Sequence, residues 1–449
     1  MVEDRGVFKR VVTSLGAADY DFLMESGLAR SLFHDAMLLE HEEVPAGASD
    51  WPDAHRVLLP TQLDFVSYPY EWSFSQLKDA ALLTLALQER ALEHGMSLKD
   101  ASAFNVQFHR GRPVFIDTLS FERDDGRPWV AYEQFCRHFL APLLLMQSRS
   151  LEMGRLLCAN LDGIPIELAS KLLGWRSYLR PGALIHLHLH ARAQRRSAGP
   201  AAGPADGRVA QISSGARLEL IHSLRRTVKG IRLSVATSTW SAYESQSTHY
   251  SHEAQSSKMS FVRKVFGDTP AGLVYDVGGN TGLYSRLAAE YGNFCVLYDA
   301  DALCVERAYL REKQTGGSRV LPLRLDLSNP TPALGVNLRE RASVLDRRRG
   351  SLVMALALVH HLRLRENIPF EMMADFFARL GDRLLIEWVG PRDEMARPML
   401  AAKKSPPPDY DLGSFLSAFS KRFWLRGQAQ VTGMDRTMLV LECRNSTTS

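Results

Sequence analysis

The second half of the chain alternates short apolar runs with longer segments that mix apolar and polar residues. The apolar runs predict strands and the mixed segments predict helices. Such alternation implies a parallel sheet with right-handed crossovers. Strands are expected at 273–277, 294–298, 319–325, 351–357, 383–388, 422–428 and 437–443, and helices at 282–291, 301–313, 369–380 and 411–420. No long helix separates the last two strands, so they should pair antiparallel at one sheet edge.

One predicted strand leads directly into a glycine-rich turn and a helix. Residues 273–277 read LVYDV, residues 278–282 read GGNTG, and the helix follows at once. Three glycines in five residues let the backbone approach a ligand closely, and the helix start offers free N–H groups. Such a turn alone serves nicotinamide, flavin, ATP and S-adenosylmethionine alike. Asp276, at the end of the strand, suits a cofactor that carries a positive charge.

Two further carboxylates follow at strand ends. Asp299 ends the next strand, 17 residues after Gly282, where a carboxylate accepts both ribose hydroxyls. Asp326, followed by Leu327, ends the third strand and is well placed for an adenine amino group. An inactive Rossmann-like domain that keeps the turn only for packing would not need three such carboxylates, since unpaired carboxylates are costly.

With these residues, the segment 273–443 resembles a class I S-adenosylmethionine-dependent methyltransferase. The family's motif I corresponds to DVGGNTG, with Asn280 where many relatives carry a glycine. The resemblance implies a Rossmann-like seven-stranded α/β sheet with a reversed last strand, and S-adenosylmethionine as the cofactor. It implies that the cofactor is held by Asp276, Gly278, Gly279, Asn280, Thr281, Gly282, Asp299, Asp326 and Leu327.

His360 and His361 follow the fourth strand, where the family's acceptor-facing residues emerge. Methyl transfer from a sulfonium needs positioning above all, and a base only if the acceptor must lose a proton. We expect one of the pair to face the acceptor or the methyl group. The alternative is that one caps the next helix and the other is solvated. No third ligand is spaced nearby, so we expect no metal site.

Three more residues are candidates for substrate contact. Glu387 ends the fifth strand, where it either binds substrate or caps the loop. Tyr243 and Tyr250 lie in the lead-in before the glycine turn. In this family such a segment often folds over the cofactor, so these aromatics are expected to form a lid, or else to lie on a surface helix that packs on the sheet.

The first half carries a different pattern. Asp100 and Asn105 form a D-x-x-x-x-N step, followed by a hairpin-like turn and a strand that ends in Asp117. The order resembles kinase-type phosphotransferases, in which the first Asp accepts a hydroxyl proton and the other two residues hold metal ions. Upstream, 75–94 would be the helix before the catalytic loop, and LDFVSYPYEWSF resembles the hinge strand.

The departures from that pattern matter as much. Leu98 and Lys99 replace the kinase His and Arg, Thr118 and Leu119 replace Phe and Gly after Asp117, and residues 1–60 hold no glycine-rich phosphate loop. This half therefore resembles a truncated, degenerate α+β kinase-like domain. The alternative is that Asp100 and Asn105 merely cap turns.

Histidines alternate at His186, His188 and His190. A strand would place all three on one face and invite a metal ion, whereas a helix would group only the first and last. The lack of nearby Asp, Glu or Cys favours interface or surface histidines instead.

Length and composition indicate the number of domains and the cellular compartment. A length of 449 residues implies two or three domains. An Ala, Gly, Pro and Ser-rich stretch marks a flexible linker at 194–215, between a domain at 1–193 and a domain at 216–449. Five cysteines without a CxxC pair indicate reduced thiols and a cytoplasmic protein. No apolar run approaches a membrane span, so no membrane partner is expected.

A net charge of +4 is far from that of a dedicated nucleic-acid binder. RNA as acceptor would rest on two clusters, Arg225–Arg226 and Arg347–Arg349, without an aromatic stacking platform. Nucleic acid is therefore not expected as a partner.

Most of the chain also resembles bacterial two-part methyltransferases similar to rhizobial host-specific nodulation-type proteins. Residues 67–85, 105–122 and 355–362 carry this resemblance. It implies methyl transfer to an unidentified acceptor, which is a small molecule, a glycan-type metabolite or a protein. The alternatives are a kinase-like phosphotransferase, or a non-catalytic substrate-binding scaffold with an accessory Rossmann domain. The oligomeric state does not follow from the sequence.

Overall fold

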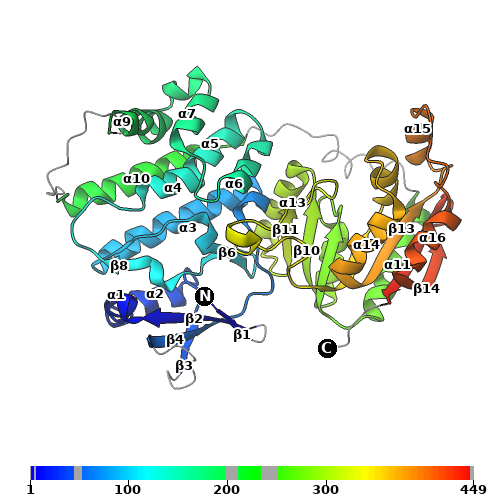
Figure 1. Cartoon of the computed structure of the whole chain (residues 1–449), viewed down its shortest axis with the longest axis horizontal. Helices are drawn as coiled ribbons and strands as arrows, with labels where there is room; N and C mark the ends of the chain where they lie inside the picture. The colour runs from blue at the N-terminus through cyan, green and yellow to red at the C-terminus, as the bar shows by residue number, and fades with distance from the viewer. Residues whose placement is uncertain (1, 5–6, 45–52, 198–210, 234–250, 445–449) are drawn as a thin grey trace. The chain divides into compact units, whose positions relative to one another are not determined.

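The computed structural model describes residues 2–4, 7–44, 53–197, 211–233 and 251–444. The chain divides into two compact units, Met1–Val235 and Ala236–Ser449. Figure 1 shows the elements of each unit along the chain. No helix in these described ranges is long and apolar enough to cross a membrane.

The second unit is built on a seven-stranded sheet with the order β11-β10-β9-β12-β13-β15-β14. Its strands are β9 (Leu273–Val277), β10 (Phe294–Asp299), β11 (Val320–Arg324), β12 (Gly350–Ala355), β13 (Gly381–Val389), β14 (Phe423–Gln430) and β15 (Arg436–Cys443). The first five run parallel, while β15 is antiparallel to both β13 and β14. The seven strands, their parallel core and the antiparallel pair at one edge are confirmed.

Strand β9 lies between β10 and β12, so the strand order reverses at this strand. Ligands of open α/β sheets bind outside the carboxyl ends of the strands at such a switch point. All five residues of β9 are buried, because helices pack on the sheet. These helices are α11 (His252–Gly267), α12 (Leu283–Glu290), α13 (Ala302–Thr315), α14 (Phe370–Leu380) and α16 (Leu412–Ser420). The short helix α15 (Ala396–Ala401) contacts residues 361–365 instead.

Two apolar layers hold this unit together. Val262 and Phe266 of α11 join Val274 and Leu352 of the strands in one buried cluster. The rings of Phe370 in α14 and Phe415 in α16 pack edge-to-face at 5.4 Å, and Phe415 lies 5.3 Å from Trp388 of β13. The candidate site lies at the carboxyl ends of the strands and in the loops that follow them.

The first unit begins with an antiparallel sheet of order β1-β2-β4-β3. Its strands are β1 (Val2–Asp4), β2 (Val7–Thr13), β3 (His41–Val44) and β4 (Ala54–Pro60), and its first helices are α1 (Ser14–Glu25) and α2 (Leu28–His34). Two short antiparallel pairs follow, made of β5 (Met96–Leu98) with β8 (Phe121–Arg123), and of β6 (Val106–His109) with β7 (Arg112–Phe115). The β6–β7 hairpin is the expected strand–turn–strand.

The long helix α3 (Phe74–Glu93) matches the helix expected at 75–94. Ser73 caps it, because its Oγ accepts the N–H of Gln76 at 3.3 Å. The segment just before it does not form the expected hinge strand. Instead Pro69–Glu71 is a 3-10 turn, fixed by the N–H of Tyr68, which donates to Glu71 Oε2 at 3.0 Å.

The remaining helices of this unit include α4 (Tyr132–Phe135), α5 (Ala141–Ser148), α6 (Leu156–Ala159), α7 (Ile166–Leu172), α8 (Pro181–Ala183), α9 (His190–Ser197) and α10 (Ser214–Gly230). Figure 1 shows α10 beside α3. His222 of α10 lies 2.8 Å from Glu89 of α3, and Arg225 pairs with the same carboxylate. Lys78 Nζ donates to the carbonyl of Ile231 at 2.6 Å.

These contacts correct the boundary expected at 216. Helix α10 buries Ile221, Leu224 and Val228, and it packs within the first unit, which extends to Val235. Its amphipathic pattern predicts a buried face but not which domain covers that face.

Two of the three alternating histidines, His186 and His188, are buried. Residues Leu184–Leu189 form a π-helix, η8, and His186 and His188 are each 1% exposed. His186 lies 2.9 Å from both Tyr132 Oη and Ser223 Oγ. His188 lies 2.7 Å from Ser170 Oγ and 2.8 Å from Ser177 Oγ. The expected surface or interface role is therefore wrong for these two, which are hydrogen-bonded core histidines.

Candidate cofactor and acceptor site

The glycine turn takes backbone angles that favour glycine. Gly278 and Gly282 have φ values of 75° and 88°, and Asn280 between them has 52°. The turn is tied to β10, because the N–H groups of Gly278 and Gly279 donate to the carbonyl of Tyr298 at 2.8 and 3.1 Å. The chain therefore holds the turn in one fixed shape.

Close packing also requires the glycines. A Cβ on Gly279 would lie 2.8 Å from Asp276 Cγ, and one on Gly282 would lie 2.8 Å from Leu297 Cδ1. Real Cβ atoms do not approach that closely, so a side chain at either position would displace the strand ends. Thr281 between them is buried.

Asp276 is a buried carboxylate at the end of β9. It is 2% exposed, and Ser285 Oγ donates to its Oδ2 at 2.6 Å. Burial raises the pKa of Asp276 to about 6, against the opposing effects of Ser285 and Lys258. When burial raises the pKa of a carboxyl group, a bound cation stabilises its ionised form.

Asp299 lies at the same edge of the sheet, since Tyr298 pairs with Val277 in parallel register. It accepts the N–H groups of Asn280 and Asp301, each at 2.8 Å. Burial raises its pKa to about 6, and the nearby Asp276 adds to the increase. The two predicted cofactor carboxylates are thus close enough to repel each other.

Asp326 completes the row of strand-end carboxylates. Asp299 pairs with Arg324 of β11, so Asp326 follows two residues beyond that pair. Its Oδ1 accepts the N–H of Ser328 at 2.9 Å and the Oγ of Ser328 at 2.6 Å. Asp326 and Leu327 are both half-buried. The expected cofactor residues therefore lie at the carboxyl ends of three neighbouring strands.

His360 neither caps the next helix nor is solvated, which were the two roles in the alternative to an acceptor-facing histidine. It precedes a π-helical turn, His361–Arg365, but makes no side-chain cap. It is 1% exposed, and within the described part of the chain neither of its ring nitrogens has a hydrogen-bond partner. Its ring lies 4.0 Å from that of the half-buried His361. A buried imidazole with two unmet nitrogens indicates a ligand or water at this position.

Both histidines are neutral near pH 7. Burial lowers the pKa of His360 far below its ordinary value, and the charges of His361, Arg436 and Lys258 lower it further. Burial likewise lowers the pKa of His361 to about 4. The same loop reaches the glycine turn, because Leu358 Cδ1 would lie 3.2 Å from a Cβ on Gly278.

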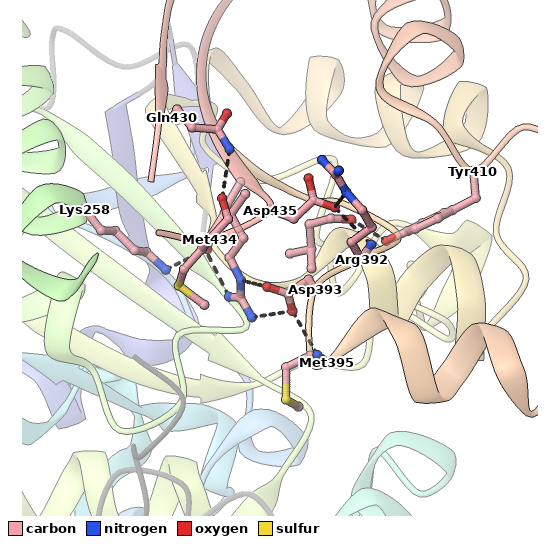
Figure 2. A network of polar contacts seen from close by, with 11 residues as sticks. Lys258, Arg392, Asp393, Met395, Tyr410, Gln430, Met434 and Asp435 are labelled. Carbon is pink, nitrogen blue, oxygen red and sulfur yellow. Dashed lines mark hydrogen bonds and ion pairs between the residues drawn. The ribbon is translucent and has the colours of Figure 1, made fainter. Parts of the chain in front are cut away.

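A buried network of charges supports this loop. Glu387, at the end of β13, is 0% exposed and accepts Lys258 Nζ at 2.6 Å and Arg436 Nη1 at 3.5 Å. Arg436 also donates to both oxygens of Asp393, at 2.7 and 3.0 Å. Figure 2 shows the network, with Lys258 at one end and Asp393 bonded to the backbone of Met395.

The network reaches the histidine loop through Glu387. The N–H of Ala357, three residues before His360, donates to this carboxylate. Burial raises the pKa of Glu387, but Lys258 and Arg436 outweigh burial and hold it below its ordinary value. Glu387 is thus an ionised anchor that joins α11, β13, β15 and the loop after β12, a broader role than the single loop cap considered from the sequence.

Sequence reasoning assigned no role to four members of this site, which are Lys258, Ser285, Asp393 and Arg436. The one local signal for Arg436 is its charge at the start of a mostly apolar strand. Tyr243 and Tyr250 lie outside the described residues, so the aromatic lid stays a prediction.

The kinase-like residues make local contacts in the first unit. Asp100 Oδ1 accepts the N–H of Ser102 at 2.9 Å. Asn105 Nδ2 and Asp117 Oδ2 both contact Ser120 Oγ, at 3.3 and 2.8 Å. Asp117 also forms an ion pair with Arg10 of β2.

Asp117 is therefore already neutralised by a cation from another strand. Burial lowers the pKa of Arg10 to about 10, so it stays charged near neutral pH. Within the described ranges no group of three His, Cys, Asp or Glu side chains gathers as metal ligands would. Asp100 and Asp117 have the contacts of turn-capping residues.

Comparison with known proteins identifies the family. No family model matches the chain. The chain is 32% identical over 438 residues to nodulation protein NoeA of Rhizobium meliloti (strain 1021), covering 95% of this chain and 90% of that protein. The chain belongs to the NoeA family. The match spans both units, so the NoeA-type architecture includes the unit with α3 as well as the seven-stranded sheet.

Solved structures show weaker similarity. The N-methyltransferase NodS of Bradyrhizobium japonicum WM9 is 9% identical, with a TM-score of 0.30 over 43% of this chain and 97% of its own. Magnesium protoporphyrin IX methyltransferase of Synechocystis PCC 6803 is 15% identical, with a TM-score of 0.31 over 42% of this chain and 85% of its own. The fold of this NoeA relative is defined by its own strand order, β11-β10-β9-β12-β13-β15-β14.

Proposed function

We propose that the C-terminal unit transfers the methyl group of S-adenosylmethionine to an acceptor. The observation that carries this proposal is Asp276, buried with a raised pKa beside a glycine turn that has no room for a Cβ at Gly279 or Gly282. The cofactor's positive charge and its size fit a buried carboxylate under a close-approach turn. When bound, it supplies an already activated methyl group.

The residues divide between the parts of the cofactor. The turn Gly278, Gly279, Asn280, Thr281 and Gly282 supplies backbone close to it, and Asp276 balances its positive end. Asp299 accepts the ribose hydroxyls with the lone pairs that the N–H groups of Asn280 and Asp301 leave open. Asp326 and Leu327 take the adenine.

On the acceptor side we assign His360 as the residue that accepts a proton from the acceptor, with His361 as the second candidate. Neither ring nitrogen of His360 has a hydrogen-bond partner among the described residues, so either can accept a hydrogen bond or a proton from the acceptor. Glu387 holds Lys258 and Arg436 in place. We therefore propose that Glu387 positions the loop and does not bind substrate, since binding substrate would break these two ion pairs.

The acceptor is a small molecule, a glycan-type metabolite or a protein. We propose that the reaction takes place in the cytoplasm, because the five cysteines are free thiols and four of them are buried. The pairing of Arg10 with Asp117 disfavours the alternative of a phosphotransferase, since a metal ion would have to displace the arginine.

A transfer screen tests the proposal. The full chain is incubated with cell extract and S-adenosylmethionine that carries a tritiated methyl group, and the extract is fractionated into protein, nucleic acid and small molecules. We expect label in one fraction, lost with Asp299→Ala and kept with Asp382→Ala. Asp382 is a matched control, because it lies in the same sheet but pairs with Arg349 at the surface. Label that is equal with and without the enzyme would contradict the proposal.

A further inference from the structure

The first unit exposes an unusual number of large apolar side chains over three consecutive segments. These are α7, the 3-10 segment η7 (Trp175–Leu179) and the π-helix η8. Trp175 and Leu179 are 70% and 72% exposed. The exposed apolar side chains of these segments, called the apolar surface here, are Leu168, Leu172, Trp175, Tyr178, Leu179, Ile185 and Leu189. Single exposed apolar residues are ordinary, but a concentration within 22 residues indicates a contact surface.

The three segments are fixed to one another around His188. Its two ring nitrogens bond Ser170 of α7 at 2.7 Å and Ser177 of η7 at 2.8 Å. The ring of Tyr178 stacks on that of His188 at 3.7 Å. These contacts fix the three segments relative to one another. The apolar surface therefore loses little conformational entropy when it contacts a partner.

The charges on these segments are mostly positive. Residues 166–192 contain four cations, at Lys171, Arg176, Arg180 and Arg192, and one acid, Glu167. Lys171 pairs with Glu167 at 2.9 Å. The arginines do not have such partners: Arg180 donates to the amide oxygen of Gln147, and Arg176 lies 5.7 Å from the ring of Trp175.

Arg149, from the end of α5, adds a further cation beside α7. Its Nε donates to the carbonyl of Leu172 at 2.8 Å. Among the residues that the structure describes, Arg149, Arg176, Arg180 and Arg192 form no ion pair with a carboxylate. Elsewhere in the same unit, arginines such as Arg56 and Arg90 do pair with one, at 3.1 Å in each case.

We propose that this surface rests on an anionic lipid bilayer. Exposed tryptophan, tyrosine and leucine side chains suit the boundary between headgroups and acyl chains. Arginines without carboxylate partners suit lipid phosphates, which they bind with two hydrogen bonds. This contact is peripheral and needs no membrane-spanning helix. It replaces the expectation of no membrane partner, which considered only long apolar runs.

A second copy of the chain fits the surface less well. A symmetric pair would place the same patch on both subunits and bring like charges together, which is unfavourable. The bilayer satisfies both properties of the surface, because it offers an apolar interior beneath a negatively charged layer.

Vesicle sedimentation tests the proposal with the full chain. We expect sedimentation with vesicles that contain phosphatidylglycerol, weakening as salt rises, and little with phosphatidylcholine alone. Trp175→Ser with Leu179→Ser should lower the affinity about tenfold. Arg176→Gln with Arg180→Gln should lower it by about the same factor.

Trp424→Ser is the matched control. Trp424 is 48% exposed and also lies against an arginine, Arg444, but belongs to the other unit. This control should sediment as the wild-type chain does, and unchanged thermal unfolding would show that the variants are folded. Equal sedimentation of all variants, no binding to phosphatidylglycerol, or equal binding to both vesicles would overturn the proposal. A dimer that Trp175→Ser with Leu179→Ser converts to a monomer would assign the surface to a second copy instead.

Discussion

His188 and His360 are equally buried, yet their surroundings differ. Each is 1% exposed. Both nitrogens of His188 meet serine hydroxyls, whereas no described residue bonds either nitrogen of His360. Buried polar groups are nearly always hydrogen-bonded, so the first is a structural residue and the second awaits a partner. Burial alone therefore does not distinguish a ligand-binding histidine from a structural one. The lack of hydrogen-bond partners at both ring nitrogens is what favours ligand binding for His360.

The same contrast separates two aspartates at strand ends. Asp117 follows β7 in the first unit and is neutralised by Arg10. Asp276 ends β9 in the second unit, and its strongest contact is a serine hydroxyl. The first keeps an ion pair within the protein, while the second keeps a raised pKa that a cationic ligand would lower.

The largest expected effect comes from His360→Ala. Loss of a proton acceptor should slow methyl transfer by about 100-fold or more, while thermal unfolding and affinity for S-adenosylhomocysteine change little. The measurement is the initial rate on the labelled fraction of the transfer screen. A normal rate would remove His360 from catalysis and leave His361 to be tested in the same way.

His188→Ala should do the reverse. The change leaves a cavity and two unpaired serine hydroxyls, which should lower the free energy of unfolding by about 2 to 4 kcal/mol. Chemical denaturation measures this loss, and affinity for S-adenosylhomocysteine per folded molecule should be unchanged. If stability stayed the same and cofactor binding fell, the structural role of His188 would be refuted.

Acid should destabilise the first unit through His186. Burial lowers its pKa to about 4 in the folded chain, below the ordinary value of 6.5. The unfolded chain therefore takes up the proton first, and stability should fall as pH drops from about 6.5 to about 4, by roughly 2 to 3 kcal/mol. Thermal unfolding across this range is the measurement, and His186→Gln should flatten the dependence. An equal slope in the variant would exclude His186 as its source.

The last effect concerns the pH dependence of cofactor binding through the two carboxylates. Raised pKa values of about 6 at Asp276 and Asp299 mean that both take up protons just below neutral pH. Binding of S-adenosylmethionine needs them ionised, so its affinity should fall below pH 6 by up to about tenfold per pH unit per proton. Titrations at several pH values measure this, and affinity that stays constant down to pH 5 would show that neither carboxylate contacts the cofactor.

Much of this fold was predictable from sequence because its signals are local. Short apolar runs between turn residues predict the strands, and the spacing of Asp276, Gly282 and Asp299 predicts their meeting at one sheet edge. The boundary at α10 was not predictable, because an amphipathic helix does not show which unit will cover it.

The charge network was not predictable for a similar reason. Glu387 lies 129 residues from Lys258 and 49 from Arg436 along the chain, and no local pattern joins them. The difference between His188 and His360 was equally hidden, since it depends on which hydroxyls the fold brings near each ring.

Calorimetric titration of the full chain with S-adenosylhomocysteine tests the central claim most directly. We predict saturable heat with one site per chain, and an affinity lowered about tenfold or more in Asp299→Ala, which removes the acceptor of the ribose hydroxyls. The surface variant Asp382→Ala should bind as the wild-type chain does. No heat from a folded wild-type chain, or equal binding by Asp299→Ala, would contradict the assignment of this sheet edge to the cofactor.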